Sequence, residues 1–321
     1  MKHNMKYKNK KGDIQDMLDS LREHGVEERL IQDVIHFRNY YKVNGSIKDR
    51  IPKPKNLFYG KEIWSMCIAA ILEDENILLC GPKATGKNLL ADNLCNVFKR
   101  PQWNVSFHAN TDSSTLIGTD TFINNEVQIR KGAVYECAIN GGFGIFDEIN
   151  MAKNDAIVVL HSALDYRKII DVPGYEKIQL HEATRFIGTM NYEYAGTKDL
   201  NEALVSRFMV IDIPQIKEDT LMNILKLEFE EADYEKLVQF AGVFLDLQTK
   251  SQNSEISTKA VDLRGIISSL KTIKRGLKPI MAINMGITGK TFDQYEKEIV
   301  NDVIKTRILQ KWESKDIFPS I

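Results

Sequence analysis

A glycine-rich segment follows a short apolar run near residue 80. Gly81-Pro-Lys-Ala-Thr-Gly-Lys87 fits the pattern G-x-x-x-x-G-K. The run Ile77–Cys80 precedes it, and apolar residues at helical spacing follow until Pro101. In this context the glycines let backbone N–H groups point inward, the helix N-terminus adds positive potential, and Lys87 can reach nucleotide phosphates. The pattern favours a phosphate-binding loop over a plain glycine turn, formed by Gly81, Pro82, Lys83, Ala84, Thr85, Gly86, Lys87, Asn88 and Leu89.

Three more polar side chains stand at the ends of predicted strands. Asp147 and Glu148 end the run Gly142–Glu148, and Asn191 ends the run Arg185–Asn191. A strand-end aspartate can hold Mg²⁺ through water, and the following glutamate can orient and polarise an attacking water. Asn191 could hold that water and the γ-phosphate. The alternatives are a helix cap for the acids and a turn cap for Asn191.

Composition narrows the class of protein. Of 321 residues, 43% are hydrophobic and 27% are charged, and the net charge is −1. A near-neutral balance argues against a dedicated duplex-DNA binder. No apolar run approaches the ~18 residues that a membrane-spanning helix needs, and the Lys-rich N-terminus lacks a signal-peptide core. We therefore expect a cytoplasmic protein with no membrane span, in which the four cysteines are reduced core residues.

The N-terminal part reads as helical. Residues 13–43 carry two amphipathic stretches and predict a helical hairpin, joined to the rest through the linker that contains Pro52 and Pro54. This hairpin is either a partner-docking module or a brace on the core, and the sequence does not choose. Beyond the linker, Phe58, Tyr59 and Gly60 begin a segment that leads directly into the glycine loop, so these residues could form a wall for the base of a nucleotide.

The middle of the chain alternates strands and helices, and the end is helical. Trp103, Val105 and Phe107 alternate as a strand, and Met209–Ile213 is a fifth strand. Two hairpins are predicted, one centred on Asn124-Asn125 and one on Pro173-Gly174. Helices are expected at Ala156–Leu164, Leu221–Phe229, Tyr234–Leu247, Ala260–Ile273 and Phe292–Ile308.

The order of these features resembles that of AAA+ ATPases. The two hairpins, Asp147-Glu-Ile-Asn150 and Gly188-Thr-Met-Asn191 are similar to the MoxR branch. Leu116-Ile-Gly118 and Gly132-Ala-Val134 are similar to its CbbQ/NorQ-like members, which carry a helix-2 insert. The resemblance covers roughly residues 57–275. It implies an α/β P-loop AAA+ core with a five-stranded parallel sheet and a smaller all-α lid. The expected boundaries are 1–55 (N-terminal extension), 56–216 (core), 217–285 (lid) and 286–321 (helical tail).

The resemblance also assigns roles. Lys87 matches the Walker A lysine, Asp147 and Glu148 the Walker B pair, and Asn191 sensor 1. Arg207, in Leu204-Val-Ser-Arg-Phe208, matches the arginine finger that enters a neighbouring subunit's site, which implies a ring, usually a hexamer. From the residues alone, a structural role for Arg207 is the alternative.

Two positions depart from the family pattern. The sensor 2 position, normally arginine, is Lys259, where a point charge lacks the bidentate fork of arginine. Arg264, one turn further on, could substitute for it, although five residues along a helix turn it to another face. Asn88 stands where Ser or Thr would place a hydroxyl on Mg²⁺. A carboxamide oxygen can ligate Mg²⁺ directly or through water, but its longer arm displaces the ion or itself. We therefore expect ATP and Mg²⁺ to bind, with Asn88 and Asp147 as metal ligands, and hydrolysis to be slow or partner-dependent.

The resemblance implies an ATPase that uses a ring to remodel or activate a client protein. Such proteins commonly work with a von Willebrand factor A-domain partner. The two hairpins would face the pore and grip the client. The alternatives are an ATP-binding scaffold with little hydrolysis, suggested by Asn88 and Lys259, and a nucleic-acid-processing NTPase, which the neutral charge disfavours.

Overall fold

A computed structural model of the chain describes residues 17–123, 126–171, 177–191 and 200–320. The chain folds as two compact units. The first holds the described residues up to Ile211, apart from Asn191 and the loop 80–85. The second holds that loop, Asn191 and the residues from Asp212 onward.

The expected five-stranded parallel sheet is confirmed. Its spatial order is β2-β5-β8-β1-β9, so the glycine loop leaves a strand that lies inside the sheet. One prediction needs correction, because the third strand in chain order ends at Asp147 and leaves Glu148 beyond it in a left-handed conformation with φ 54°. The five strands are β1 (Ile77–Gly81), β2 (Gln102–Ser106), β5 (Phe143–Asp147), β8 (Arg185–Asn191) and β9 (Met209–Asp212).

Asn76 ties the start of β1 to its two neighbours in the sheet. Its side-chain oxygen accepts the N–H of Phe186 in β8 at 2.9 Å, and its backbone carbonyl accepts the N–H of Met209 in β9 at 2.8 Å. Gly188 lets β8 approach β1 closely, because a Cβ there would lie 2.7 Å from Leu78. Every residue of β1 is buried, as expected for the interior of a parallel sheet.

Helices surround this sheet, and a segment that was predicted as one helix forms two. The single helix expected at Ala156–Leu164 is wrong: the chain forms α7 (Asn154–Val158) and α8 (His161–Leu164), separated by a turn. The run Ile157-Val158-Val159 explains the break, since consecutive β-branched residues lose side-chain freedom in a helix. The other helices of this part are α3 (Lys61–Leu72), α4 (Lys87–Val97), α5 (Ser113–Ile117), α6 (Ala133–Ile139), η2 (Ile149–Met151) and α9 (Glu202–Val205).

Both predicted hairpins are present. β3 (Gly118–Ile123) pairs antiparallel with β4 (Glu126–Lys131), and β6 (Ile169–Ile170) pairs antiparallel with β7 (Ile178–Gln179). The expected turns at Asn124-Asn125 and Pro173-Gly174 lie outside the described residues.

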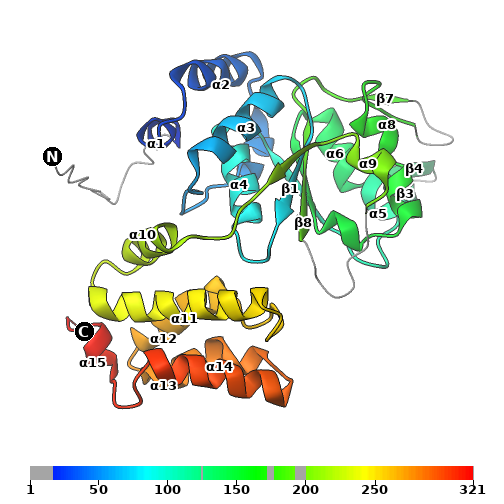
Figure 1. Ribbon diagram of the computed structural model, residues 1–321. Coiled ribbons are helices and arrows are strands. Elements are labelled where there is room, and N and C mark those ends of the chain that lie inside the picture. The colour runs from blue at the N-terminus through cyan, green and yellow to red at the C-terminus, as the bar shows by residue number, and fades with distance from the viewer. Residues whose placement is uncertain (1–16, 124–125, 172–176, 192–199, 321) are drawn as a thin grey trace. The chain divides into compact units, whose positions relative to one another are not determined.

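The N-terminal helices pack on the first unit. α1 (Met17–Glu23) and α2 (Glu28–Tyr40) lie beside α4 and α3, as Figure 1 shows. Phe37 is buried against Phe98 in an edge-to-face pair with centroids 5.2 Å apart, and Arg38 donates to the carbonyl of Val97. Tyr41 receives a hydrogen bond on its carbonyl from Arg100, whose pKa burial lowers to about 10. η1 (Gly45–Arg50) follows. Of the two alternatives left by the sequence, these contacts support the brace.

The second unit is helical and has one continuous core. Two of its helices, α13 and α15, were not expected, and the predicted start of α12 at Ala260 is wrong because the helix begins at Leu263. Residues from the final segment, including Trp312 and Phe318, are buried in the same core as Leu221 and Phe240. The helices are α10 (Glu218–Glu228), α11 (Tyr234–Gln252), α12 (Leu263–Ile273), α13 (Pro279–Gly286), η3 (Thr288–Lys290), α14 (Gln294–Arg307) and α15 (Ser314–Ile317).

All four cysteines are buried thiols, as expected for core residues. Burial raises the pKa of Cys67, Cys95 and Cys137, which makes these thiols poor nucleophiles. Among the described residues, no helix combines the length and the apolar character needed to cross a bilayer.

Candidate functional site

The glycine loop has the backbone that its sequence predicts. Gly81 has φ 149°, and a Cβ there would collide with the carbonyl of Ile213, so only glycine fits. Ala84 and Gly86 are left-handed, with φ 64° and 89°. Thr85 closes the loop by donating its hydroxyl to the carbonyl of Pro82 at 3.0 Å. Consecutive turns of this kind aim backbone N–H groups into a concavity that suits an anion.

The helix that follows begins at once. Gly86 is the N-cap of α4 and Lys87 its first residue, with only 6% of that lysine exposed. Asn88 is exposed and Leu89 half-buried in the first turn, while Lys83 is exposed in the loop. A buried lysine at a helix N-terminus beside a glycine cradle fits a phosphate-binding role.

Phe58 lies against the end of the loop, and the ring of the next residue, Tyr59, packs on His24 with centroids 5.3 Å apart. A Cβ on Gly86 would lie 3.4 Å from the ring of Phe58. The backbone of Phe58 is tied on both sides, since its N–H donates to Asn93 at 2.8 Å and its carbonyl accepts from Trp64 at 2.9 Å. Gly60, with φ 145°, opens α3. Phe58 is therefore the residue of this segment that borders the glycine loop, and the wall for a base that includes Tyr59 and Gly60 stays a prediction.

Thr189 joins the two acids at the end of β5. Its hydroxyl donates to Oδ1 of Asp147 at 2.7 Å and accepts the N–H of Glu148 at 3.2 Å. The register explains the contact: Phe146 pairs with Gly188, so Asp147 and Thr189 are the next residues on adjacent strands. Asn191, two residues after Thr189, points to the same face of β8 and is half-buried. Thr189 was not predicted from the sequence. Its position two residues before Asn191 in the same predicted strand could have indicated that both side chains face the same side.

The two sensor 2 candidates lie in the second unit. Lys259 is exposed in a turn before α12, and Arg264 is exposed in the first turn of that helix. Lys259 therefore lies outside the helix that carries Arg264.

Arg207 lies between α9 and β9 and packs against its own chain. Its Nε donates to the carbonyl of His161 at 3.1 Å, and it pairs with Asp165 at 3.9 Å. Burial and the Arg207 cation lower the pKa of His161. The side chain of Arg207 is 22% exposed, so part of the guanidinium reaches the surface.

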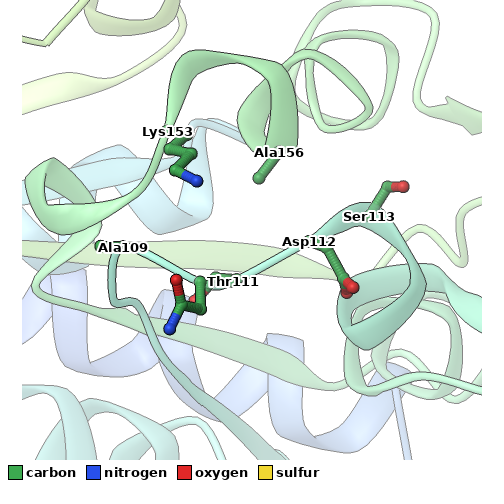
Figure 2. A pocket seen from close by; sticks show the side chains of 7 residues that line it. Ala109, Thr111, Asp112, Ser113, Lys153 and Ala156 are labelled. Atoms are coloured by element: carbon green, nitrogen blue, oxygen red, sulfur yellow. The ribbon is translucent and has the colours of Figure 1, made fainter.

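A cavity of about 350 Å³ lies where the chain continues beyond β2 and β5 (Figure 2). Lys153 and Asp112 line it from opposite sides, and the hydrogen bonds that Asp112 accepts from Thr115 and Ser114 hold the pKa of its carboxyl at about 2. The sequence did not predict this cavity, because its lining residues come from two separate segments, each a loop with the start of the following helix (α5 or α7), and neither segment carries a binding motif. They are Ala109, Asn110, Thr111, Asp112, Ser113, Lys153 and Ala156.

Comparisons with known proteins agree with this geometry. The uncharacterized protein YojN of Bacillus subtilis (strain 168) is 32% identical over 244 residues, which cover 74% of this chain and 80% of that protein. An uncharacterized protein of Staphylococcus epidermidis (strain ATCC 12228) is 34% identical and covers 72% of this chain and 90% of its own length. A solved structure from Cytophaga hutchinsonii covers 91% of both chains at 17% identity, with a TM-score of 0.45. Residues 76–208, from the start of β1 past the two acids to Phe208, match the family model for the AAA domain (dynein-related subfamily). The chain therefore carries an AAA domain, and it belongs to the same family as the Bacillus and Staphylococcus proteins.

Proposed function

We propose that this AAA domain hydrolyses ATP and that Glu148 acts on the attacking water. The observation that carries the proposal is the shared hydroxyl of Thr189, which orients Asp147 and the backbone of Glu148 in the same sheet whose strand β1 leads into the glycine loop. Glu148 is held in a left-handed conformation, and such strain is found where a side chain must point in one direction.

Each remaining residue has a place in this proposal. The loop from Gly81 to Leu89 binds the phosphates, Lys87 neutralises their charge, and Tyr59 with Gly60 borders the base. Asn191 positions the attacking water. Mg²⁺ would stabilise the charge that develops on the phosphates, and the side chains that would hold it are Asp147 and Asn88. The donor set fits this ion, because both side chains offer oxygen ligands and that of Asp147 is already oriented by Thr189.

We further propose a MoxR-like ring, with a hexamer as the expected size, that remodels a client protein. Arg207 would act on ATP bound by a neighbouring copy, and Lys259 or Arg264 would contact phosphate from the lid. The β3–β4 hairpin supports a role in gripping a client, since its cross-strand pair Phe122 and Val127 is 72% and 62% exposed. A von Willebrand factor A-domain protein is the partner type that the family resemblance favours.

A nucleotide-binding scaffold with little hydrolysis is the second candidate, and Asn88 is the reason. Its side chain is exposed in the first turn of α4, at the position where a hydroxyl would serve Mg²⁺. We expect Asn88→Thr to raise steady-state ATP turnover several-fold, because a shorter oxygen ligand restores the usual ion position. Measurement of phosphate release for both proteins tests this, and a slower Asn88→Thr enzyme would contradict it.

The deciding experiment compares ATP turnover of the wild type, Glu148→Gln and Arg207→Ala, together with nucleotide affinity and mass by light scattering. The proposal expects both variants to lose turnover and keep nucleotide binding, and expects ATP to assemble a ring. If all three proteins bind ATP tightly but none of them hydrolyses it, with or without candidate clients, the scaffold is favoured instead.

A further inference from the structure

Three contacts set the direction of the Arg207 side chain. Its Nε donates to the carbonyl of His161 at 3.1 Å, and a terminal nitrogen donates to the carbonyl of Ala203. The other terminal nitrogen lies 3.9 Å from a carboxylate oxygen of Asp165, which is beyond hydrogen-bond range but close enough for an ion pair. Asp165 is the one charged group among these three contacts.

Asp165 is itself held by Arg167. The Arg167 guanidinium donates to both carboxylate oxygens, at distances from 2.6 to 3.2 Å, and the Arg167 backbone N–H donates at 3.0 Å. The Asp165 side chain is 12% exposed, whereas that of Arg167 is 49% exposed. The hydrogen bond from Arg167 is the main cause that lowers the pKa of Asp165, so the carboxylate is ionised at neutral pH. Arg167 is therefore the close partner of this carboxylate, and Arg207 is the distant one.

This unequal sharing has two consequences. Arg207 can move away from Asp165 at little cost, because Arg167 still neutralises the largely buried Asp165 carboxylate. If the Asp165 carboxylate were removed, the Arg167 and Arg207 guanidiniums would repel each other as like charges. Arg207 would also lose the electrostatic attraction that holds it at this position.

We propose that Asp165 is a positioning residue for Arg207, holding the guanidinium in a defined but releasable place from which it reaches the nucleotide of a neighbouring copy. The inference rests on the proposed function, in which Arg207 acts in trans. Arg167 keeps Asp165 compensated while Arg207 is engaged elsewhere.

The test is a mutant cycle on steady-state ATP turnover, with kcat and KM measured for the wild type, Asp165→Asn, Arg207→Ala and the double variant. Asp165→Asn is expected to lower kcat about tenfold and leave KM within about twofold, because nucleotide binding does not use Arg207. The double variant is expected to match Arg207→Ala, since a positioning residue has nothing left to position. Asp165→Glu should restore part of kcat because it keeps the charge.

Asp19→Asn is the matched control. The Asp19 side chain is 52% exposed and pairs with Arg22 at 2.7 Å, so the same chemical change removes an exposed ion pair from the same unit. It should leave kcat unchanged. Urea unfolding of each variant confirms that it is folded.

The outcomes separate this inference from the function on which it rests. If Arg207→Ala turns over ATP as fast as the wild type, the arginine-finger role fails, and the inference fails with it. If Arg207→Ala is slow while Asp165→Asn is as fast as the wild type or faster, only the inference is overturned. An equal loss on replacing Asp165 in the wild type and in Arg207→Ala would show a merely structural role and would overturn it too.

Discussion

At the scale of single residues, the Thr189 hydroxyl is the contact on which both acids depend. Thr189→Val keeps the shape and removes the hydroxyl, so the Glu148 N–H loses its acceptor and Asp147 its donor. We expect the free energy of unfolding to fall by about 0.5–1.5 kcal/mol, the usual net contribution of a hydrogen bond, because both hydrogen bonds are only part-buried. We also expect kcat for ATP to fall about tenfold while nucleotide affinity changes little.

Thr189→Ser is the matched control, because it keeps the hydroxyl and loses only a methyl group. It should stay near the wild type in kcat. Urea unfolding and phosphate release on the three proteins check the prediction. Equal turnover of Thr189→Val and the wild type would show that the acids are oriented without this hydroxyl.

His161 carries a pH dependence. Burial, and then the nearby Arg207 cation, lower the pKa of His161 from its ordinary value of 6.5. As the pH falls through 6.5, the unfolded chain binds a proton at this histidine before the folded chain does, so the folded state loses stability on that side. We expect the wild type to lose more stability than His161→Gln between pH 7.5 and 5.5.

Urea midpoints of both proteins at pH 7.5, 6.5 and 5.5 measure this difference. The other histidines, including His181 with its lowered pKa, contribute equally to both proteins and cancel. A constant difference across the range would mean that Arg207 and burial have no net effect on the folded-state pKa of His161.

The residues that belong to a local motif could be predicted from the sequence. The residues that meet only because two strands pair could not. The glycine loop and Asp147 follow from local sequence, since each stands at the end of a strand, and Glu148 comes directly after Asp147. Thr189 gains its role from the register of β5 against β8, which no local pattern encodes. The contacts of Arg207 with Asp165 join segments that are 42 residues apart in the chain.

At the scale of elements, the N-terminal hairpin behaves as part of the first unit. Phe37→Ala removes a ring that is 8% exposed and packs on Phe98. We expect it to lower the free energy of unfolding by about 3 kcal/mol, as large-to-small changes in a core do. Tyr40→Ala, on the same helix but 74% exposed, should change it by less than about 0.5 kcal/mol.

Urea unfolding followed by circular dichroism compares these two variants with the wild type. If both changes were equally harmless, the hairpin would be a separately attached docking module, which was the alternative that the sequence left open. Its burial could not be read from the sequence, because an amphipathic face predicts that a helix is covered but not by what.

At the scale of the whole molecule, the order of motifs predicts the fold class, and the sheet confirms it. The spatial order β2-β5-β8-β1-β9 is not encoded in any one strand. It arises from long-range contacts such as those of Asn76 with both neighbours of β1. In the helical unit, α13 and α15 were missed because short helices leave too few turns for periodicity to register.

In the proposed ring, the surface around Arg207 should govern the assembly of copies of the chain. Tyr166 stands between Asp165 and Arg167 and is 90% exposed. In the proposed ring, Arg207 must approach a neighbouring copy, so Tyr166 would be buried at the same contact. A buried tyrosine at the centre of an interface is often worth about 2 kcal/mol or more, which is roughly a thirtyfold change in affinity.

We therefore expect Tyr166→Ala to need at least about tenfold more protein for ATP-dependent assembly, while nucleotide affinity and unfolding stay as in the wild type. Light scattering over a concentration series with ATP measures this. Tyr40→Ala serves again as the control, because it removes another exposed tyrosine ring, 74% exposed, from the N-terminal hairpin. Assembly of Tyr166→Ala at wild-type concentrations would place the contact between copies elsewhere, and Arg207 would then need another route to a neighbour's nucleotide.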